Sequence, residues 1–153
     1  MKKVFKAYGA LYKCGDTIGL TDKTLSDEVM RKIVTNSPLK VPVVSDLGKA
    51  ISGDPDYNIG YAILGYQPAG VIDGEESRIV CTVFFNDRHR KEYETILNSS
   101  KERSKLRFGF LLSKVRDAEN DDIVSGIISA ISLNDTGLGS NIISYGWEDE
   151  MGD

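Results

Sequence analysis

The sequence has few of the residues from which catalytic and metal sites are usually built. It contains a single histidine, His89, and only two cysteines, Cys14 and Cys81. Two cysteines cannot form a disulfide framework, and a structural zinc site usually takes four cysteine or histidine ligands. We therefore expect no metal and no cofactor, and we interpret Cys81 as a buried reduced thiol within an apolar strand.

Long apolar runs and an excess of positive charge are also missing. The longest apolar stretches, RIVCTVFF (residues 78–85) and IVSGIISAISL (residues 123–133), are much shorter than a membrane-spanning helix. The formal net charge is −4, and the basic residues between 87 and 105 are interleaved with acids, whereas nucleic-acid-binding domains usually carry a basic stripe. We expect a soluble cytoplasmic protein that binds neither membrane nor nucleic acid.

The sequence does contain many short segments typical of β-strands, separated by turn residues. Seven segments are predicted to be strands: 2–13, 39–46, 59–66, 78–85, 105–115, 123–135 and 141–147. One helix is predicted after Thr24 or Ser26 and another over residues 86–100. This pattern predicts a β-rich α+β fold, a closed or nearly closed antiparallel β-barrel with two packed helices. One domain would span residues 1–146, followed by an acidic tail at 147–153.

The segment KLRFGFLLSKV (residues 105–115) sets the expected core. Alternate side chains fall on one face of the strand, and neighbouring strands share this phase. We expect seven residues to lie together: Phe108, Phe110, Leu112, Ile131 and Leu133 buried, with Val83 and Ile63 nearby. Arg107 and Gly109 lie on the other face, and a glycine inside a strand usually marks a close approach by another group.

No active site is evident from residue chemistry alone. His89 follows the cap of a predicted helix among charged residues, which is typical of a solvated position. The acidic loop DAENDD (residues 117–122) has Asp122 and Ile128 where a calcium-binding EF-hand needs glycine and glutamate. We therefore interpret this loop as a hairpin turn and not as a metal site.

The order of the segments resembles that of the prohead protease family of tailed phages, which is related in fold to herpesvirus assemblin. The matching segments are KVPVVSD followed by NIGYAILGY, then FFNDRHRKEYETILNSS, LRFGFLLSKV and GIISAISLNDTGLGSNII. They are similar, in this order, to the family's histidine strand, the helix before the nucleophile strand, the nucleophile strand and the Glu-Ile-Ser-Leu strand. The resemblance covers nearly the whole chain.

The resemblance also implies that the catalytic residues are absent. The nucleophilic serine of the family falls at Arg107, two residues before the motif's glycine, Gly109. Asp46 is the nearest match to the family histidine, and Ala130 occupies the place often held by an acid. A guanidinium cannot attack a carbonyl, and an aspartate cannot replace imidazole as the base near neutral pH. We expect Arg107 and Asp46 to form a structural ion pair from adjacent strands.

The resemblance thus predicts a non-catalytic structural protein of a phage capsid, with a decoration, cement or head-assembly role. Its partners would be the major capsid or scaffold proteins and further copies of itself, in the virion and, during assembly, in the host cytoplasm. One alternative is an active serine protease of the prohead maturation type with a displaced site, using Ser113 or Ser45 with His89. Another is a host-directed phage binding protein.

Overall fold

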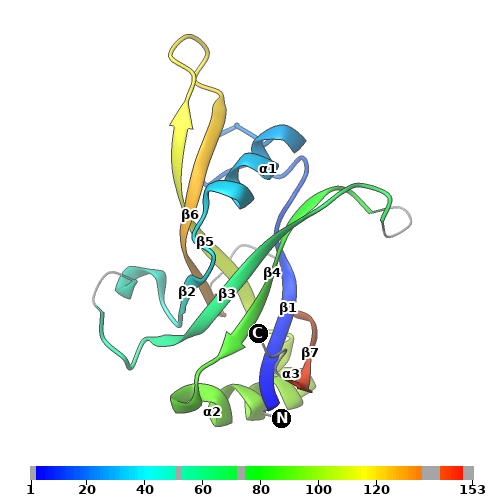
Figure 1. Ribbon diagram of the computed structural model, residues 1–153, viewed down its shortest axis with the longest axis vertical. Helices are drawn as coiled ribbons and strands as arrows, with labels where there is room; N and C mark the ends of the chain where they lie inside the picture. Colours follow the sequence, from blue (N-terminus) through cyan, green and yellow to red (C-terminus); the bar gives the residue numbers. More distant parts are fainter. Residues whose placement is uncertain (1–2, 51–52, 72–74, 136–141, 150–153) are drawn as a thin grey trace.

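The computed structural model describes residues 3–50, 53–71, 75–135 and 142–149, which form one seven-stranded sheet with helices packed along it (Figure 1). The strands are β1 (Lys3–Lys13), β2 (Val41–Val44), β3 (Asn58–Gln67), β4 (Arg78–Phe85), β5 (Arg107–Arg116), β6 (Ile123–Asn134) and β7 (Ile142–Asp149). The helices are α1 (Asp27–Asn36), the short 3-10 helix η1 (Leu47–Lys49), α2 (Asp87–Asn98) and α3 (Ser100–Arg103).

The strands lie in the order β5-β6-β2-β3-β4-β1-β7. Neighbouring strands are antiparallel except β2 and β6, which run parallel where Val43 and Val44 pair with Ile131 and Ser132. The sheet is therefore mixed, and among the described residues its two end strands, β5 and β7, are not paired with each other. The β-rich α+β class is confirmed, but the predicted closed or nearly closed antiparallel barrel is wrong.

The sheet nevertheless curls, so that β5 packs against β1 although four strands separate them in the sheet order. The ring of Phe108 on β5 lies directly against the backbone of Gly9 on β1. A Cβ atom at Gly9 would lie 3.0 Å from Cδ2 of this ring and closer still to Cε2. Since Phe108 is fully buried, the ring has nowhere to move, and only glycine fits at position 9.

We expect Gly9→Ala to lower the free energy of unfolding by about 1–3 kcal/mol, because the added methyl overpacks the core against Phe108. Phe108→Leu should relieve part of this strain in the double variant. Denaturant unfolding of the two single variants and the double variant measures the coupling, which we expect to be at least about 0.5 kcal/mol. Additive losses would contradict the contact between the two positions.

Helix α1 begins where the sequence predicts it and is fixed to β6 at its end. The hydroxyl of Ser26 accepts the N–H of Val29 as the N-cap, and acidic residues occupy the first turn, where they favour the helix dipole. At the other end, the hydroxyl of Ser37 donates to the carbonyl of Ile33 at 2.6 Å and accepts the N–H of Ile128 at 2.9 Å. The last turn is thereby tied to β6.

The sequence predicts Asn86 or Asp87 as the cap of α2, and the helix begins after Asn86. Its side-chain oxygen accepts the N–H of His89, while its amide donates to the carbonyl of Asn58 at the start of β3. Tyr93 and Leu97 face the core, and the ring of Tyr93 stacks on Phe85 at 5.1 Å. The helix therefore packs across one end of the sheet (Figure 1).

The core contains most of the residues that the alternation predicts. Four of the seven expected residues are fully buried: Phe108, Ile131, Leu133 and Val83. Phe110 and Leu112 are only half-buried and pack against the edge of the core. Ile63, expected near these residues, is 41% exposed and lies outside the core. The reason is a register shift between β2 and β3: Val43 lies opposite Gly60, but the next residue, Val44, lies opposite Asn58. Beyond this shift, the side chains of β3 that point into the core are the alternate set to the one expected.

Pro42 is tolerated in β2, an interior strand, because the residues of β2 that pair with β6 come after Pro42 in the chain. The parallel ladder involves Val43 and Val44, whereas Pro42 lies opposite Tyr61 of β3. The missing N–H of proline therefore removes no hydrogen bond to β6. The sequence predicts an edge position or a strand start for this proline, and it does lie at the start of the strand.

The last strand reaches into the segment predicted to be an acidic tail. β7 extends to Asp149, so Trp147 and Glu148 belong to the sheet, and residues 150–153 lie outside the described part of the chain. The indole N–H of Trp147 donates to a carboxylate oxygen of Glu94 on α2 at 3.2 Å. Glu148 pairs with Lys6 of β1 at 2.5 Å. These contacts connect β7 to α2 and to β1.

Candidate functional site

The ends of three adjacent strands carry most of the residues that the prohead-protease resemblance assigns to a degenerate site. Arg107 begins β5 and pairs with Asn134 at the end of β6. The side-chain amide of Asn134 donates to the carbonyl oxygen of Ser45 at 2.9 Å, just beyond β2. Asp46 follows Ser45 in the chain. This row, made of Arg107, Asn134, Ser45 and Asp46, is called the strand-end row below.

Asp46 has a structural function within the row. It is the N-cap of η1, and its carboxylate accepts the backbone N–H of Gly48 at 2.9 Å. Such a hydrogen bond stabilises the tight turn that follows a strand and engages one carboxylate oxygen. The short helix lies beside both β5 and β6. The Asp46 carboxylate therefore stabilises this turn and does not orient a catalytic side chain.

The predicted ion pair between Arg107 and Asp46 is wrong. Strand β6 lies between β5 and β2, and the Asp46 carboxylate is engaged by the turn of η1, so the two side chains do not pair. Arg107 is exposed, and its side chain has no ion pair or hydrogen bond with any residue that the structure describes. The guanidinium lies in solvent at the start of β5.

Ala130, which the resemblance places at the acid position, does not belong to the strand-end row. It is buried, pairs with Leu111 of β5, and precedes Asn134 by four residues, roughly 13 Å along β6. Its methyl group contributes to the core and cannot orient a base. The three positions of the degenerate site therefore do not converge on one point.

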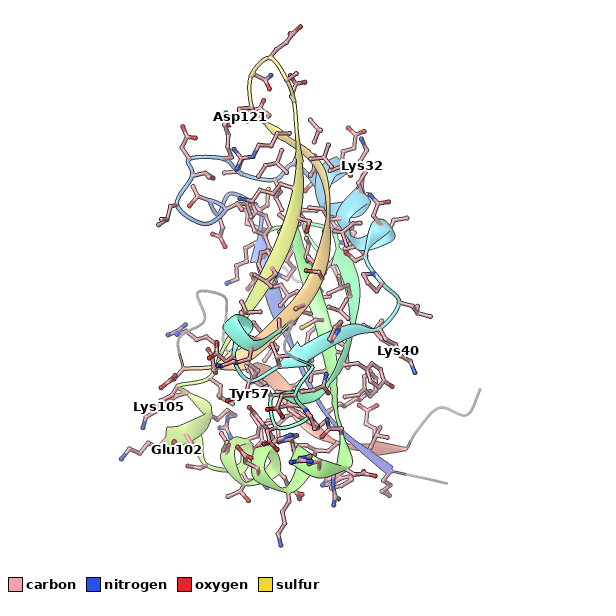
Figure 2. All side chains as sticks on the ribbon, turned by 90° about the vertical axis from the view of Figure 1, so that its left-hand side faces the viewer. Lys32, Lys40, Tyr57, Glu102, Lys105 and Asp121 are labelled. Atoms are coloured by element: carbon pink, nitrogen blue, oxygen red, sulfur yellow. The ribbon has the colours of Figure 1, made fainter. Side chains whose placement is uncertain are left out.

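The alternative catalytic pair, Ser113 with His89, is not assembled either. The ring nitrogen Nε2 of His89 lies 3.0 Å from the carbonyl oxygen of Pro55, and Nδ1 lies 3.9 Å from a carboxylate oxygen of Glu92. Ser113 is exposed on β5, six residues or roughly 20 Å beyond Arg107. In Figure 2, β5 runs from the end marked by Lys105, where α2 packs, toward the loop marked by Asp121.

Ser45, the other candidate nucleophile, makes backbone contacts on both sides. Its N–H donates to the carbonyl of Tyr57 at 2.8 Å, and its carbonyl accepts from Asn134. Neither of the ring contacts of His89 is made with Ser45. Since a serine nucleophile needs a base within hydrogen-bonding reach, this geometry provides no activated hydroxyl.

A cavity of about 310 Å³ lies beside β2, between the loop after η1 and the start of α2. Among its lining residues are Pro42, Val44, Lys49, Pro55, Asn86 and Arg88. Arg88 pairs with Asp56, and Asn86 caps α2, so both side chains also hold the wall in place. No sequence motif marks this cavity, because its walls come from four separate segments.

Two carboxylates of the acidic hairpin loop between β5 and β6 are paired with lysine and arginine side chains. The ammonium group of Lys23 donates to the carbonyl of Asn120 at 3.1 Å and pairs with Asp122 at 3.0 Å, and Asp122 raises the pKa of Lys23. Arg116 pairs with Asp121 at 2.8 Å. The interpretation of this segment as a hairpin turn is confirmed, and two of its carboxylates already have cationic partners.

The strongly perturbed titratable groups lie in the core and not at the strand-end row. Burial raises the pKa of the Cys81 thiol, which therefore stays protonated and unreactive at neutral pH. Burial also raises the pKa of Tyr93 to about 12. The interpretation of Cys81 as a buried free thiol is confirmed, and neither group is placed for catalysis.

The described residues contain neither a metal-binding cluster nor a helix that could span a membrane. No group of three or more histidine, cysteine, aspartate or glutamate side chains within them is arranged to hold a metal ion. None of the helices in this part of the chain has the length and apolar character needed to cross a bilayer.

The comparisons with known proteins give no relative of this chain. No family model matches the sequence, and no curated protein or solved structure matches it. The prohead-protease resemblance therefore depends on the short segments quoted above and on their order.

Proposed function

We propose that this chain is a non-catalytic structural protein of a phage capsid, with a decoration, cement or head-assembly role, built on a prohead-protease-like fold. The proposal is supported mainly by the kinds of side chain found in the strand-end row. It holds a solvated guanidinium at Arg107, an amide at Asn134, and a carboxylate at Asp46 that is engaged as a helix cap. No nucleophile and base are paired there.

The order of the elements supports the same assignment. Helix α2 lies between β4 and β5, as the resemblance expects for the helix before the nucleophile strand, and β6 returns beside β5. A protease fold without its nucleophile and base retains its surfaces, so partner binding is the function that remains for it. The partners that the proposal names are major capsid or scaffold proteins and other copies of the chain, in the virion and in the host cytoplasm during assembly.

A cleavage assay tests whether the chain is catalytic. The purified chain is incubated with the capsid and scaffold proteins of the same phage, and the products are identified by mass spectrometry. We expect no site-specific cleavage, because loss of the triad members usually removes several orders of magnitude in rate. Site-specific products that disappear in Ser113→Ala or His89→Ala would contradict the proposal and favour a protease with a displaced site.

A further inference from the structure

Strand β5 has an open edge along its second half. It is an end strand of the sheet, with β6 as its one ladder partner among the described residues. At both register shifts of this ladder, the extra residue belongs to β6: Ser129 at the first and Val124 at the second. β5 is therefore regular and contains no proline. Proteins usually interrupt long open edges with bulges or prolines, because unpaired N–H and C=O groups can bind another strand.

Apolar side chains are exposed on one face of this edge. Leu111 is 39% exposed and Val115 is 54% exposed, and alternation places both on the same face of β5. Ile127 of β6, which lies opposite Ser113 on this face, is 43% exposed. The three side chains form a small apolar strip, and a further strand beside β5 would cover its two outer members, Leu111 and Val115.

The charges on β5 are all positive. Residues 107–116 contain Arg107, Lys114 and Arg116 and no acid. Arg116 is neutralised by Asp121, but Lys114 is half-buried and has no ion pair or hydrogen bond with another described residue. A half-buried cation without a counter-charge favours an anionic ligand, since pairing offsets the cost of its desolvation.

We propose that the edge of β5 over residues 111–116, called the docking edge below, binds an extended acidic segment of a partner protein as an added strand. Main-chain hydrogen bonds would continue the sheet, aliphatic side chains of the segment would cover Leu111 and Val115, and a carboxylate would face Lys114. The inference rests on the proposed binding function and names the chemistry of its partner.

A second copy of the chain fits this edge less well. Pairing β5 with another β5 would bring together two strands that carry only positive charge, which is unfavourable. The other end strand, β7, has acids only at its last two positions, Glu148 and Asp149, and the carboxylate of Glu148 already pairs with Lys6. Charge complementarity therefore favours a separate acidic segment.

Peptide binding to the full chain tests the docking edge. The probes are an acetylated Glu-Val-Glu-Val-Glu-Val peptide, its Lys-Val counterpart, and the Glu-Val peptide with alternate amides N-methylated. We expect the Glu-Val peptide to bind at least about tenfold more tightly than either other peptide, from one favourable charge pair and the intact main-chain hydrogen bonds. Backbone NMR shifts should be confined to β5 and β6.

Charge reversal provides the matched control. Lys114→Glu should exchange the preference, so that the Lys-Val peptide binds about tenfold more tightly than the Glu-Val peptide. Lys91→Glu makes the same charge change at an exposed position of α2 and should leave the preference unchanged. Because Lys114 lies at the sheet edge, the variant should fold, which its NMR spectrum verifies.

Three results would overturn the inference: equal binding of the N-methylated peptide, a preference that Lys114→Glu does not change, or shifts located away from β5 and β6. Self-association of the free chain that Lys114→Glu abolishes, measured by sedimentation velocity, would also overturn it and would identify a second copy as the partner. None of these outcomes decides whether the chain is a capsid component, which is measured separately on phage particles.

Discussion

Phe108→Ala is expected to lower the free energy of unfolding by about 3–5 kcal/mol, the usual range for truncating a fully buried aromatic residue. Phe108 is 0% exposed, pairs with Leu133 across the β5–β6 ladder, and fills the space above Gly9 on β1. Its removal would leave a cavity at the point where β5 meets β1 across the curled sheet. Urea denaturation followed by circular dichroism measures the loss.

The matched control is Phe110→Ala, two residues further along the same face of β5. The sequence alone would assign Phe110 the same burial, but its ring is only half-buried. We expect its truncation to cost roughly half as much as that of Phe108, because less apolar surface returns to water. An equal or larger loss for Phe110, or a loss below about 1 kcal/mol for Phe108, would contradict this packing.

Gly60→Ala should be destabilising by roughly 3 kcal/mol, from backbone strain together with overpacking. Gly60 has a φ of +157°, a conformation that residues with a side chain rarely adopt. A Cβ atom there would lie 3.0 Å from the carbonyl carbon of Phe84 and closer still to its oxygen. Because the obstacle is backbone of the neighbouring strand, it cannot rotate away. Thermal and urea unfolding of the variant measure the effect.

Gly65→Ala on the same strand is the control for Gly60. Its added Cβ would meet a side-chain methyl of Val80 at 3.3 Å, and its backbone is ordinary. Since a methyl group can shift by a few tenths of an ångström, we expect a change within about 1 kcal/mol of zero. Similar stabilities for the two variants would show that the close approach at Gly60 is wrong.

Local patterns predicted most individual elements, because their causes lie within a few residues. The sequence limited the caps to Thr24 or Ser26 for α1 and to Asn86 or Asp87 for α2, and Ser26 and Asn86 cap the helices. The alternation in β5 correctly placed Phe108 inward. Short-range periodicity determines such features, so one sequence is sufficient to predict them.

The order of the strands could not be predicted in this way, since it depends on contacts between distant segments. The insertion of β6 between β5 and β2 separates Arg107 from Asp46 and makes one strand pair parallel. The register shift beside Gly60, which exposes Ile63, depends on how β2 meets β3. The local sequence of a strand does not indicate which other strand it will pair with or in which register.

The strand-end row shows the same limit for the site. The resemblance placed Arg107, Asp46 and Ala130 together, but only Arg107 and Asp46 lie near one end of the three strands. Asn134 was not identified, although it connects β6 to Ser45, because a single asparagine at the end of a predicted strand carries no distinctive pattern. The cavity beside β2 was missed for a similar reason, since four segments build its walls.

The most direct test of the proposed function is the protein composition of purified particles of the phage that encodes this chain. Quantitative mass spectrometry of such particles should find the intact chain in a fixed ratio to the major capsid protein. Its absence from the particles, with the chain bound instead to a host protein in infected cells, would contradict a capsid role and favour a host-directed binding protein.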